Sequence, residues 1–139
     1  FLPGGYPELH APALAAAERF RVGLVAARDR GALIYGECGG YMALGESLRV
    51  GGVSYPMAGL LPGETDMSRP RRTLGYRRLR HSSPLPWPRE LRGHEFHYSS
   101  GMAAAPLFEA TDAAGTPVQP MGAAVGRVMG SYAHVIDVA

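Results

Sequence analysis

Apolar side chains follow a helical spacing near the start of the chain and a strand-like spacing beyond it. From Ala13 to Arg30 they recur every three or four residues, at Leu14, Ala17, Phe20, Leu24 and Ala27. This spacing predicts a single amphipathic helix, and Gly31 suits the position just after its last turn. The short apolar run that follows predicts a buried strand over Leu33–Glu37, and a second helix is expected over Gly39–Leu48.

The later part of the chain is expected to form mainly short strands. Alternating apolar and polar residues, with glycine and proline turns between them, divide it into segments. These are strand pieces or a hairpin over Val50–Leu61, a polar loop over residues 62–73, strands over Leu74–Leu79 and Gly93–Ser99, a hairpin or loop over Ala103–Val118, and final strand pieces over Val125–Met129 and Ser131–Val138. Because a strand, a turn and a helix follow one another around Cys38, we predict an α/β fold with parallel strands in three layers.

Cys38 is the only cysteine of the chain and lies at the expected strand-to-helix turn. The run Gly36-Glu37-Cys38-Gly39-Gly40 has the spacing of a nucleophile elbow, a sharp turn that exposes a catalytic side chain, with sulfur in place of a serine oxygen. Glycines are needed there because larger side chains would collide. The N-terminus of the following helix is expected to favour the thiolate. The alternative is a buried cysteine that acts as a small apolar residue, but the flanking glycines favour a nucleophile.

Composition narrows the class of protein. The 139 residues amount to one domain at most, and the net charge of +2 does not indicate a nucleic-acid partner. No apolar run approaches the ~20 residues of a membrane span, and no signal-like segment opens the chain, so no membrane partner is predicted. All 14 basic residues are arginine, so the lysine of a Walker A phosphate loop is missing. A lone cysteine excludes an internal disulfide, and we therefore expect a cytoplasmic protein.

A cysteine nucleophile needs a proton acceptor, which is most often a histidine. We select His134, because a strand that ends at the carboxyl edge of the sheet would bring its imidazole to the Cys38 turn. A structural histidine at a strand end is an equal alternative. Gly39 would offer its backbone N–H to a developing oxyanion, and Gly5 in the Gly4-Gly5 turn would offer a second, although a plain turn is the simpler interpretation of those two glycines.

Two polar clusters invite other interpretations. The run His94-Glu95-Phe96-His97 lacks the histidine spacing of a helical zinc site, and on a strand its two histidines point to opposite faces. We therefore predict no metal, and we assign Glu95 and His97 to a strand that is either structural or substrate-facing. The arginines crowded into residues 69–80 are interpreted as a solvated surface in preference to a clamp for carboxylates or phosphate.

Six motifs occur in order along nearly the whole chain: Leu2–Ala11, Glu37–Gly40, Met57–Gly59, Leu74–Tyr76, Gly93–Ser99 and Ser131–His134. Together they closely resemble the glutamine amidotransferase domains of cobyrinic and hydrogenobyrinic acid a,c-diamide synthases. The resemblance implies a class I glutamine amidotransferase-like fold, which is a flavodoxin-like three-layer sandwich. It also implies an N-terminally truncated domain, because the family's domain begins with further strands and a helix.

The resemblance implies a glutaminase role in cobalamin biosynthesis. Residues 1–139 would form one partial glutamine amidotransferase domain that takes glutamine and releases ammonia. In the family, a preceding ATP-binding synthetase domain, absent from this chain, binds the corrinoid and uses ATP and Mg to activate its a and c acetate carboxylates for amidation. No cofactor is expected within this chain itself. The oligomeric state stays open, with a homodimer as one candidate.

By position, the resemblance makes Cys38 the nucleophile and His134 the general acid and base, with Gly39 and Gly5 forming the oxyanion hole. Cys38 would attack the side-chain amide of glutamine. His134 would protonate the departing ammonia and then activate water against the γ-glutamyl thioester.

The chain departs from the broader class in two places. Many class I glutaminases carry a glutamate two residues after the histidine, where this chain has Ile136. The cobyrinate branch is similar in lacking it, so the resemblance implies a cysteine–histidine dyad. Asp137 is near but would face away from His134 on a strand. Relatives often carry glutamine where this chain has Met42, so glutamine recognition is expected to depend on backbone groups.

Two other functions remain open at this point. One is another elbow-cysteine hydrolase of similar fold, for example a peptidase-like enzyme. The other is a non-catalytic fragment, too truncated to hold Cys38 and His134 together. The Leu2–Ala11 and Gly93–Ser99 runs argue against the first of these, and an assay of glutamate release separates all three.

Overall fold

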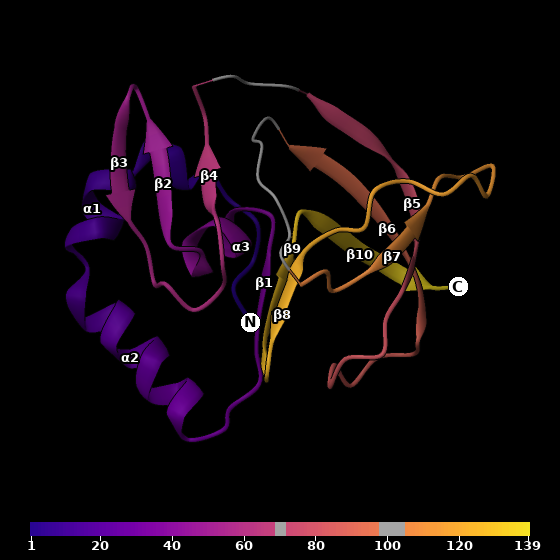
Figure 1. The fold of residues 1–139 in the computed structure, drawn as a ribbon, viewed down its shortest axis with the longest axis horizontal. Coiled ribbons are helices and arrows are strands. Elements are labelled where there is room, and N and C mark those ends of the chain that lie inside the picture. The colour runs from indigo at the N-terminus through magenta and orange to yellow at the C-terminus, as the bar shows by residue number, and fades with distance from the viewer. Residues whose placement is uncertain (69–71, 98–104) are drawn as a thin grey trace.

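The computed structural model of the chain describes residues 1–68, 72–97 and 105–139 (Figure 1). Its helical elements are η1 (Pro7–Leu9), α1 (Ala11–Ala16), α2 (Glu18–Asp29) and α3 (Gly39–Leu44). The single helix expected over Ala13–Arg30 begins earlier and breaks at Ala17, whose backbone leaves the helical region at φ −77° and ψ 63°. Gly31 follows α2 with φ 78°, as the capping prediction required. No helix in the described ranges is long and apolar enough to cross a membrane.

The strands form three small sheets. They are β1 (Ile34–Glu37), β2 (Ser47–Val50), β3 (Val53–Pro56), β4 (Glu64–Asp66), β5 (Thr73–Arg80), β6 (Glu90–His97), β7 (Glu109–Thr111), β8 (Ala123–Val125), β9 (Val128–Ser131) and β10 (Ala133–Val138). The strand orders are β1-β9-β8, β10-β6-β5-β7 and β3-β2-β4. Pairing is parallel between β1 and β9 and between β2 and β4, and antiparallel in the other ladders of the described chain.

Several predicted boundaries are wrong. The helix expected over Gly39–Leu48 ends at Leu44, because Gly45 is extended and the chain turns into β2. The expected hairpin forms at Gly51-Gly52, whose φ values are 58° and 78°, with β2 as its first strand. The expected polar loop over residues 62–73 contains β4, which pairs with β2.

The strands predicted for the second half of the chain agree more closely with the structure. The strands expected over Leu74–Leu79 and Gly93–Ser99 are confirmed as β5 and β6, while Tyr98 and Ser99 lie outside the described residues. The segment 103–118 holds β7 and a turn closed by a bridge from Thr111 to Pro117, and its first two residues also lie outside the described ranges. The final strand pieces expected over Val125–Met129 and Ser131–Val138 are observed as β9 and β10, but the break lies at Tyr132 instead of Gly130, and Val125 ends β8.

The mixed α/β class is confirmed, and β1 shows how its layers are arranged. Side chains alternate across a strand, so neighbours face opposite layers. Ile34 packs in a cluster with Leu44 of α3 and with side chains of α2, whereas Tyr35 packs with Leu79 and Phe108 on the side of the antiparallel sheet. Figure 1 shows the helices on one side of β1 and β9 and the β10-β6-β5-β7 sheet on the other. Within the described residues the layers are thus the helices, the β1-β9-β8 sheet and, on its other face, the antiparallel β10-β6-β5-β7 sheet.

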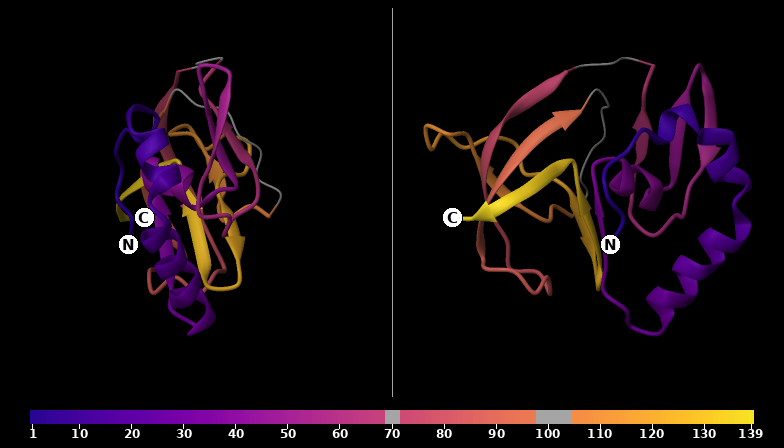
Figure 2. Two further views of the ribbon diagram at one scale, coloured as in Figure 1. Left: turned by 90° about the vertical axis from the view of Figure 1, so that its left-hand side faces the viewer. Right: turned by 180° about the vertical axis from the view of Figure 1, so that it is seen from behind.

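The strand β9 leads the chain from one sheet into the other. It runs parallel to β1, with Ser131 opposite Glu37. After Tyr132 the chain enters β10, which pairs antiparallel with β6 so that His134 lies opposite His94 (Figure 2). The carboxyl ends of β1 and β9 thus meet at one edge, where ligands of open α/β sheets collect.

Candidate active site

Cys38 occupies a strained corner between β1 and α3. Its φ of 52° and ψ of −111° make it the one non-glycine residue with positive φ in the described ranges. Such a conformation costs about 1–3 kcal/mol and is typical of functional turns. The Cys38 N–H donates to the carbonyl oxygen of Ser131 at 2.8 Å, so β9 helps to hold the corner. This geometry is that of a nucleophile elbow.

The elbow glycines are explained by close packing. A Cβ atom at Gly36 would lie 2.7 Å from the carbonyl oxygen of Gly40, and a Cβ at Gly40 would overlap the carbonyl oxygen of Leu2. Helix α3 therefore approaches both β1 and the N-terminal segment more closely than any larger residue allows. The spacing predicted this tight turn correctly.

His134 is held by Glu37, the residue directly before Cys38. The Nδ1 atom of His134 lies 3.0 Å from Oε1 of Glu37, and the N–H of Val135 donates to Oε2 of the same carboxylate at 3.2 Å. Because a carboxylate accepts hydrogen bonds, Nδ1 carries the proton and Nε2 is left as the basic nitrogen. The side chain of Glu37 is 14% exposed and that of His134 is 34% exposed, so solvent screens this pair incompletely.

This contact corrects the expectation of an unsupported dyad. Ile136 and Asp137 do not support His134: Ile136 is exposed, and Asp137 accepts the N–H of Val138. Glu37 was missed because it lies 97 positions away from His134 in the chain. A signal was present, since a carboxylate at the end of β1 must share the sheet edge with whatever follows the parallel strand beside it.

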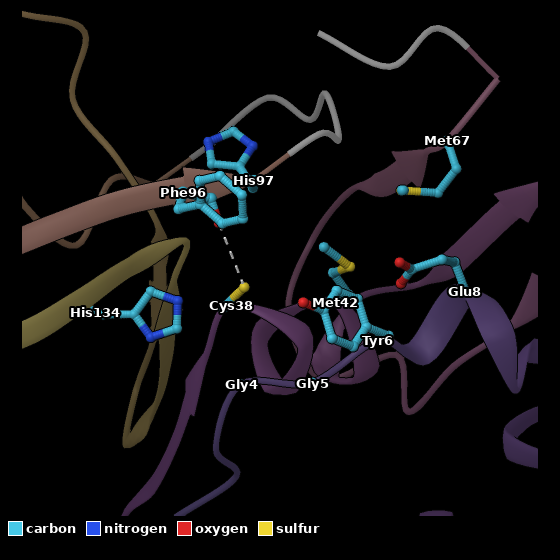
Figure 3. Close-up of a pocket in the computed structure, with 10 residues that line it drawn as sticks. All are labelled: Gly4, Gly5, Tyr6, Glu8, Cys38, Met42, Met67, Phe96, His97 and His134. Carbon is cyan, nitrogen blue, oxygen red and sulfur yellow. Dashed lines mark hydrogen bonds between the residues drawn. The ribbon is translucent and has the colours of Figure 1, made fainter. Parts of the chain in front are cut away.

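Cys38 and His134 border the same cavity of about 430 Å³ (Figure 3). Gly4 lies between them, because a Cβ atom there would be 2.9 Å from Cε1 of His134 and 3.6 Å from Cβ of Cys38. The sulfur also faces the carbonyl oxygen of Phe96 at 3.9 Å. The lining residues are Gly4, Gly5, Tyr6, Glu8, Cys38, Met42, Met67, Phe96, His97 and His134.

The surroundings of Cys38 favour the neutral thiol. Burial raises its pKa most, the charges of Glu37 and Glu8 raise it further, and a hydrogen bond from the Gly39 N–H lowers it by less. The N–H at the start of α3 thus favours the thiolate, as expected of a helix N-terminus, but burial and the two carboxylates outweigh it and the pKa of Cys38 is raised. A neutral thiol acts as a nucleophile only when a base takes its proton, and His134 lines the same cavity.

The two predicted oxyanion glycines lie against each other. A Cβ atom at Gly39 would be 2.6 Å from the carbonyl oxygen of Gly5 and 2.9 Å from its backbone nitrogen. Gly5 lines the cavity, and the Gly39 N–H is directed at the cysteine sulfur. Backbone N–H groups gathered beside a nucleophile suit the stabilisation of negative charge on a carbonyl oxygen.

Glu95 and His97 form a buried network beside the cavity. Glu95 is 7% exposed and accepts hydrogen bonds from Nε of Arg77 at 3.0 Å and from Nε2 of His97 at 2.8 Å. Burial alone would raise the pKa of Glu95, but the hydrogen bonds and charges of His97 and Arg77 outweigh it and hold the pKa below its ordinary value. His97 stacks on Tyr132 with ring centroids 4.2 Å apart and lines the cavity. His97 is thus at the site, and Glu95 positions it.

The structure also bears on the predictions for the 94–97 run and for the arginines of residues 69–80. His94 contacts Tyr76, in contrast to His97, so the two histidines do not converge. Within residues 1–68, 72–97 and 105–139, no group of three or more His, Cys, Asp or Glu side chains is arranged to hold a metal ion. Arg77 is largely buried in an ion pair, contrary to the expectation of a solvated arginine surface. Arg72, Arg78 and Arg80 are exposed as expected, and Arg69 and Arg71 lie outside the described residues.

The fold and this geometry indicate a class of protein: an α/β domain with a cysteine at a strand-to-helix corner, an arrangement typical of acyl-transfer enzymes. Comparison with known proteins identifies the family. The chain belongs to the CobB/CobQ-like glutamine amidotransferase domain family, whose model matches residues 1–138.

Curated relatives carry one recurring name. A hydrogenobyrinate a,c-diamide synthase from Brucella abortus biovar 1 is 51% identical over 141 residues, which cover 99% of this chain and 32% of that protein. Proteins of the same name from a Sinorhizobium species and from Rhodobacter capsulatus are 50% and 47% identical, over 100% and 98% of this chain and 33% and 32% of their own lengths. The chain therefore spans about a third of the length of these relatives.

Proposed function

We propose that this domain hydrolyses glutamine and delivers the ammonia for ATP-dependent amidation of the a and c acetate carboxylates of a corrinoid. The observation that carries the proposal is the cavity shared by Cys38 and His134, with the imidazole held by Glu37, in a member of a glutamine amidotransferase family. Cys38 acts as the nucleophile, and His134 as the general acid and base. Gly39 and Gly5 supply the oxyanion donors.

The first half of the reaction forms a thioester. Nε2 of His134 takes the proton of Cys38 as the sulfur attacks the amide carbon of glutamine. The N–H groups of Gly39 and Gly5 stabilise the resulting oxyanion. When the carbon–nitrogen bond breaks, the imidazolium returns a proton to the leaving nitrogen, and ammonia departs from a γ-glutamyl thioester.

The second half restores the cysteine. His134 removes a proton from water as the water oxygen attacks the thioester carbon, and the carbon–sulfur bond then breaks to leave glutamate. The proton returns to the sulfur. Glu37 stabilises each transient imidazolium and keeps the proton of Nδ1 in place.

The corrinoid step belongs to the part of the protein beyond this domain. This part of the proposal rests on the name of the relatives and on the fact that the chain covers about a third of their length. ATP with Mg would convert each acetate carboxylate to an acyl phosphate, and ammonia would displace phosphate to form the amide. The relatives' name favours hydrogenobyrinate as the substrate, and residues 1–139 then form the glutaminase domain of a cytoplasmic enzyme.

The test uses the full-length protein and measures glutamate release from glutamine. Cys38→Ser is expected to lower kcat by about 10³-fold or more, because the hydroxyl is a far weaker nucleophile in this site. The same variant should still amidate the corrinoid when ammonium chloride replaces glutamine, which serves as the control for folding. A variant that still hydrolyses glutamine contradicts the proposal. Hydrolysis of other amides, but not glutamine, by the unaltered protein favours a different elbow-cysteine hydrolase.

A further inference from the structure

The carboxylate of Glu8 enters the cavity at the end away from His134. Glu8 lies in η1, whose short turn begins at the buried Pro7 and is closed by hydrogen bonds from Leu9 to Tyr6 and from His10 to Pro7. The side chain is half-buried and lines the cavity. Figure 3 shows its oxygens directed toward Met42, with Cys38 between Glu8 and His134. A rigid turn thus presents a negative charge to the cavity.

Glu8 has no partner within the described chain. No hydrogen bond or ion pair joins it to another residue of the described ranges. It is also the one acidic side chain among the described residues that line the cavity. Its charge opposes formation of the Cys38 thiolate. A carboxylate beside a nucleophile that must become an anion hinders the chemistry unless a cation neutralises it.

The rest of the cavity suits the body of an amino acid amide. Its volume of about 430 Å³ lies within the range of small-molecule sites. The backbone groups near Cys38 are at one end, Met42 and Met67 offer apolar contact, and Glu8 is at the other end. An amide at the sulfur, a methylene chain over Met42 and a cationic group at Glu8 match these three parts in order.

We propose that Glu8 binds the α-ammonium group of the amide donor and thereby selects free glutamine over other primary amides. The inference rests on the proposed glutaminase function. Binding of the ammonium neutralises Glu8 and removes its opposition to the thiolate, so donor recognition and nucleophile activation are coupled. Side-chain recognition then supplements the backbone contacts that were expected from the presence of Met42.

The experiment compares two donors on the full-length protein. Glutaramate has the same γ-amide and carboxylate as glutamine but lacks the α-amino group. Glu8→Gln should lower kcat/KM for glutamine roughly 10- to 100-fold, mainly through KM, as expected for the loss of a charged hydrogen bond. Hydrolysis of glutaramate should be unchanged or faster. Glu8→Asp, which keeps the charge, should recover part of the preference, and Glu90→Gln, at an exposed position of β6, should change nothing.

Each outcome decides the matter. A preference for glutamine that falls in Glu8→Gln, is partly recovered in Glu8→Asp and is unchanged in Glu90→Gln supports the inference. Equal losses with both donors, or no loss with either, overturn it, since a structural role would not distinguish the donors. If the unaltered protein releases no glutamate at all, the proposed function itself fails and the role of Glu8 falls with it. Thermal unfolding of each variant confirms that the domain is folded.

Discussion

At the scale of single residues, Glu37 has two opposing effects on the site. Its carboxylate accepts the Nδ1 proton of His134, and its charge raises the pKa of the adjacent Cys38. A negative group beside the sulfur disfavours a resting thiolate, while the same group stabilises the imidazolium that forms during proton transfer. The arrangement therefore favours a neutral cysteine at rest, which in the proposed mechanism loses its proton only as it reacts.

Glu37→Gln tests this role. The amide keeps the size of the side chain but removes the negative charge, and it has one acceptor oxygen in place of the two that receive Nδ1–H of His134 and the N–H of Val135. The kcat for glutamine hydrolysis should fall by roughly 10²-fold or more, while KM changes little. Steady-state glutamate release measures both constants.

The control for Glu37 is Glu109→Gln, which removes an equal charge at an exposed position of β7. It should leave kcat unchanged. A kcat for Glu37→Gln within a factor of about two of the unaltered protein would show that His134 needs no carboxylate.

At the scale of elements, the contact between α3 and the N-terminal segment sets the shape of the elbow. Leu2 bridges β1 at Gly36 and passes over Gly40 at the start of α3. The next residues of that segment, Gly4 and Gly5, then reach His134 and Gly39. A short helix of six residues has little stability of its own, so its position depends on this packing.

A pair of glycine variants measures that packing. Gly40→Ala would force its Cβ against the carbonyl oxygen of Leu2, and overpacking of this kind lowers the free energy of unfolding by roughly 1–3 kcal/mol. Gly23→Ala is the matched control: this glycine lies in α2 with nothing within 4 Å of the added methyl, so helix propensity should raise stability by about 0.5–1 kcal/mol. Urea unfolding followed by circular dichroism measures the free energy of unfolding of both variants. Equal stability of the two variants would refute the packing argument.

At the scale of the whole molecule, the cavity is assembled from parts of the chain that are distant in sequence. The N-terminal segment and the elbow form one wall, and β6 and β10 of the antiparallel sheet form the other. The network of Arg77, Glu95 and His97 joins β5 to β6, and the stacking of His97 on Tyr132 joins this sheet to the end of β9. Glu95 is therefore expected to stabilise the wall that carries His97.

Glu95→Gln should lower the free energy of unfolding by about 3 kcal/mol at pH 7, since it leaves Arg77 without its charged partner. The pKa of Glu95 is lowered in the folded state, so its stabilisation is complete above the ordinary carboxyl pKa and is lost as pH falls through the folded-state value. The unaltered protein should therefore lose stability on acidification more steeply than the variant.

Urea titrations between about pH 6 and pH 3 test this difference, since that interval spans the ordinary carboxyl pKa. Glu90→Gln, on the exposed first residue of the same strand, is the control. Parallel pH profiles for Glu95→Gln and the unaltered protein would contradict a stabilising role of the charge.

Local features of the site could be predicted from the order of residues. The glycine spacing around Cys38 is sufficient because the strand, the turn and the helix are all encoded within a few neighbouring positions. The strands β5 and β6 could be predicted from alternation for the same reason. His134 was expected near Cys38 because parallel strands end at the same edge of a sheet. The two residues do line one cavity.

The other contacts of the site depend on the register of strand pairing and on how distant segments pack against each other. Whether Glu37 reaches His134 depends on the pairing of β1 with β9 and on the turn at Tyr132. Glu8 of η1 and His97 of β6 line the cavity from opposite walls. Such juxtapositions are set by packing between distant segments, and no spacing along the chain encodes them. The residues around Cys38 therefore specify the sharp turn that presents the sulfur, while only the folded arrangement brings His134, Glu37 and Glu8 to their places around it.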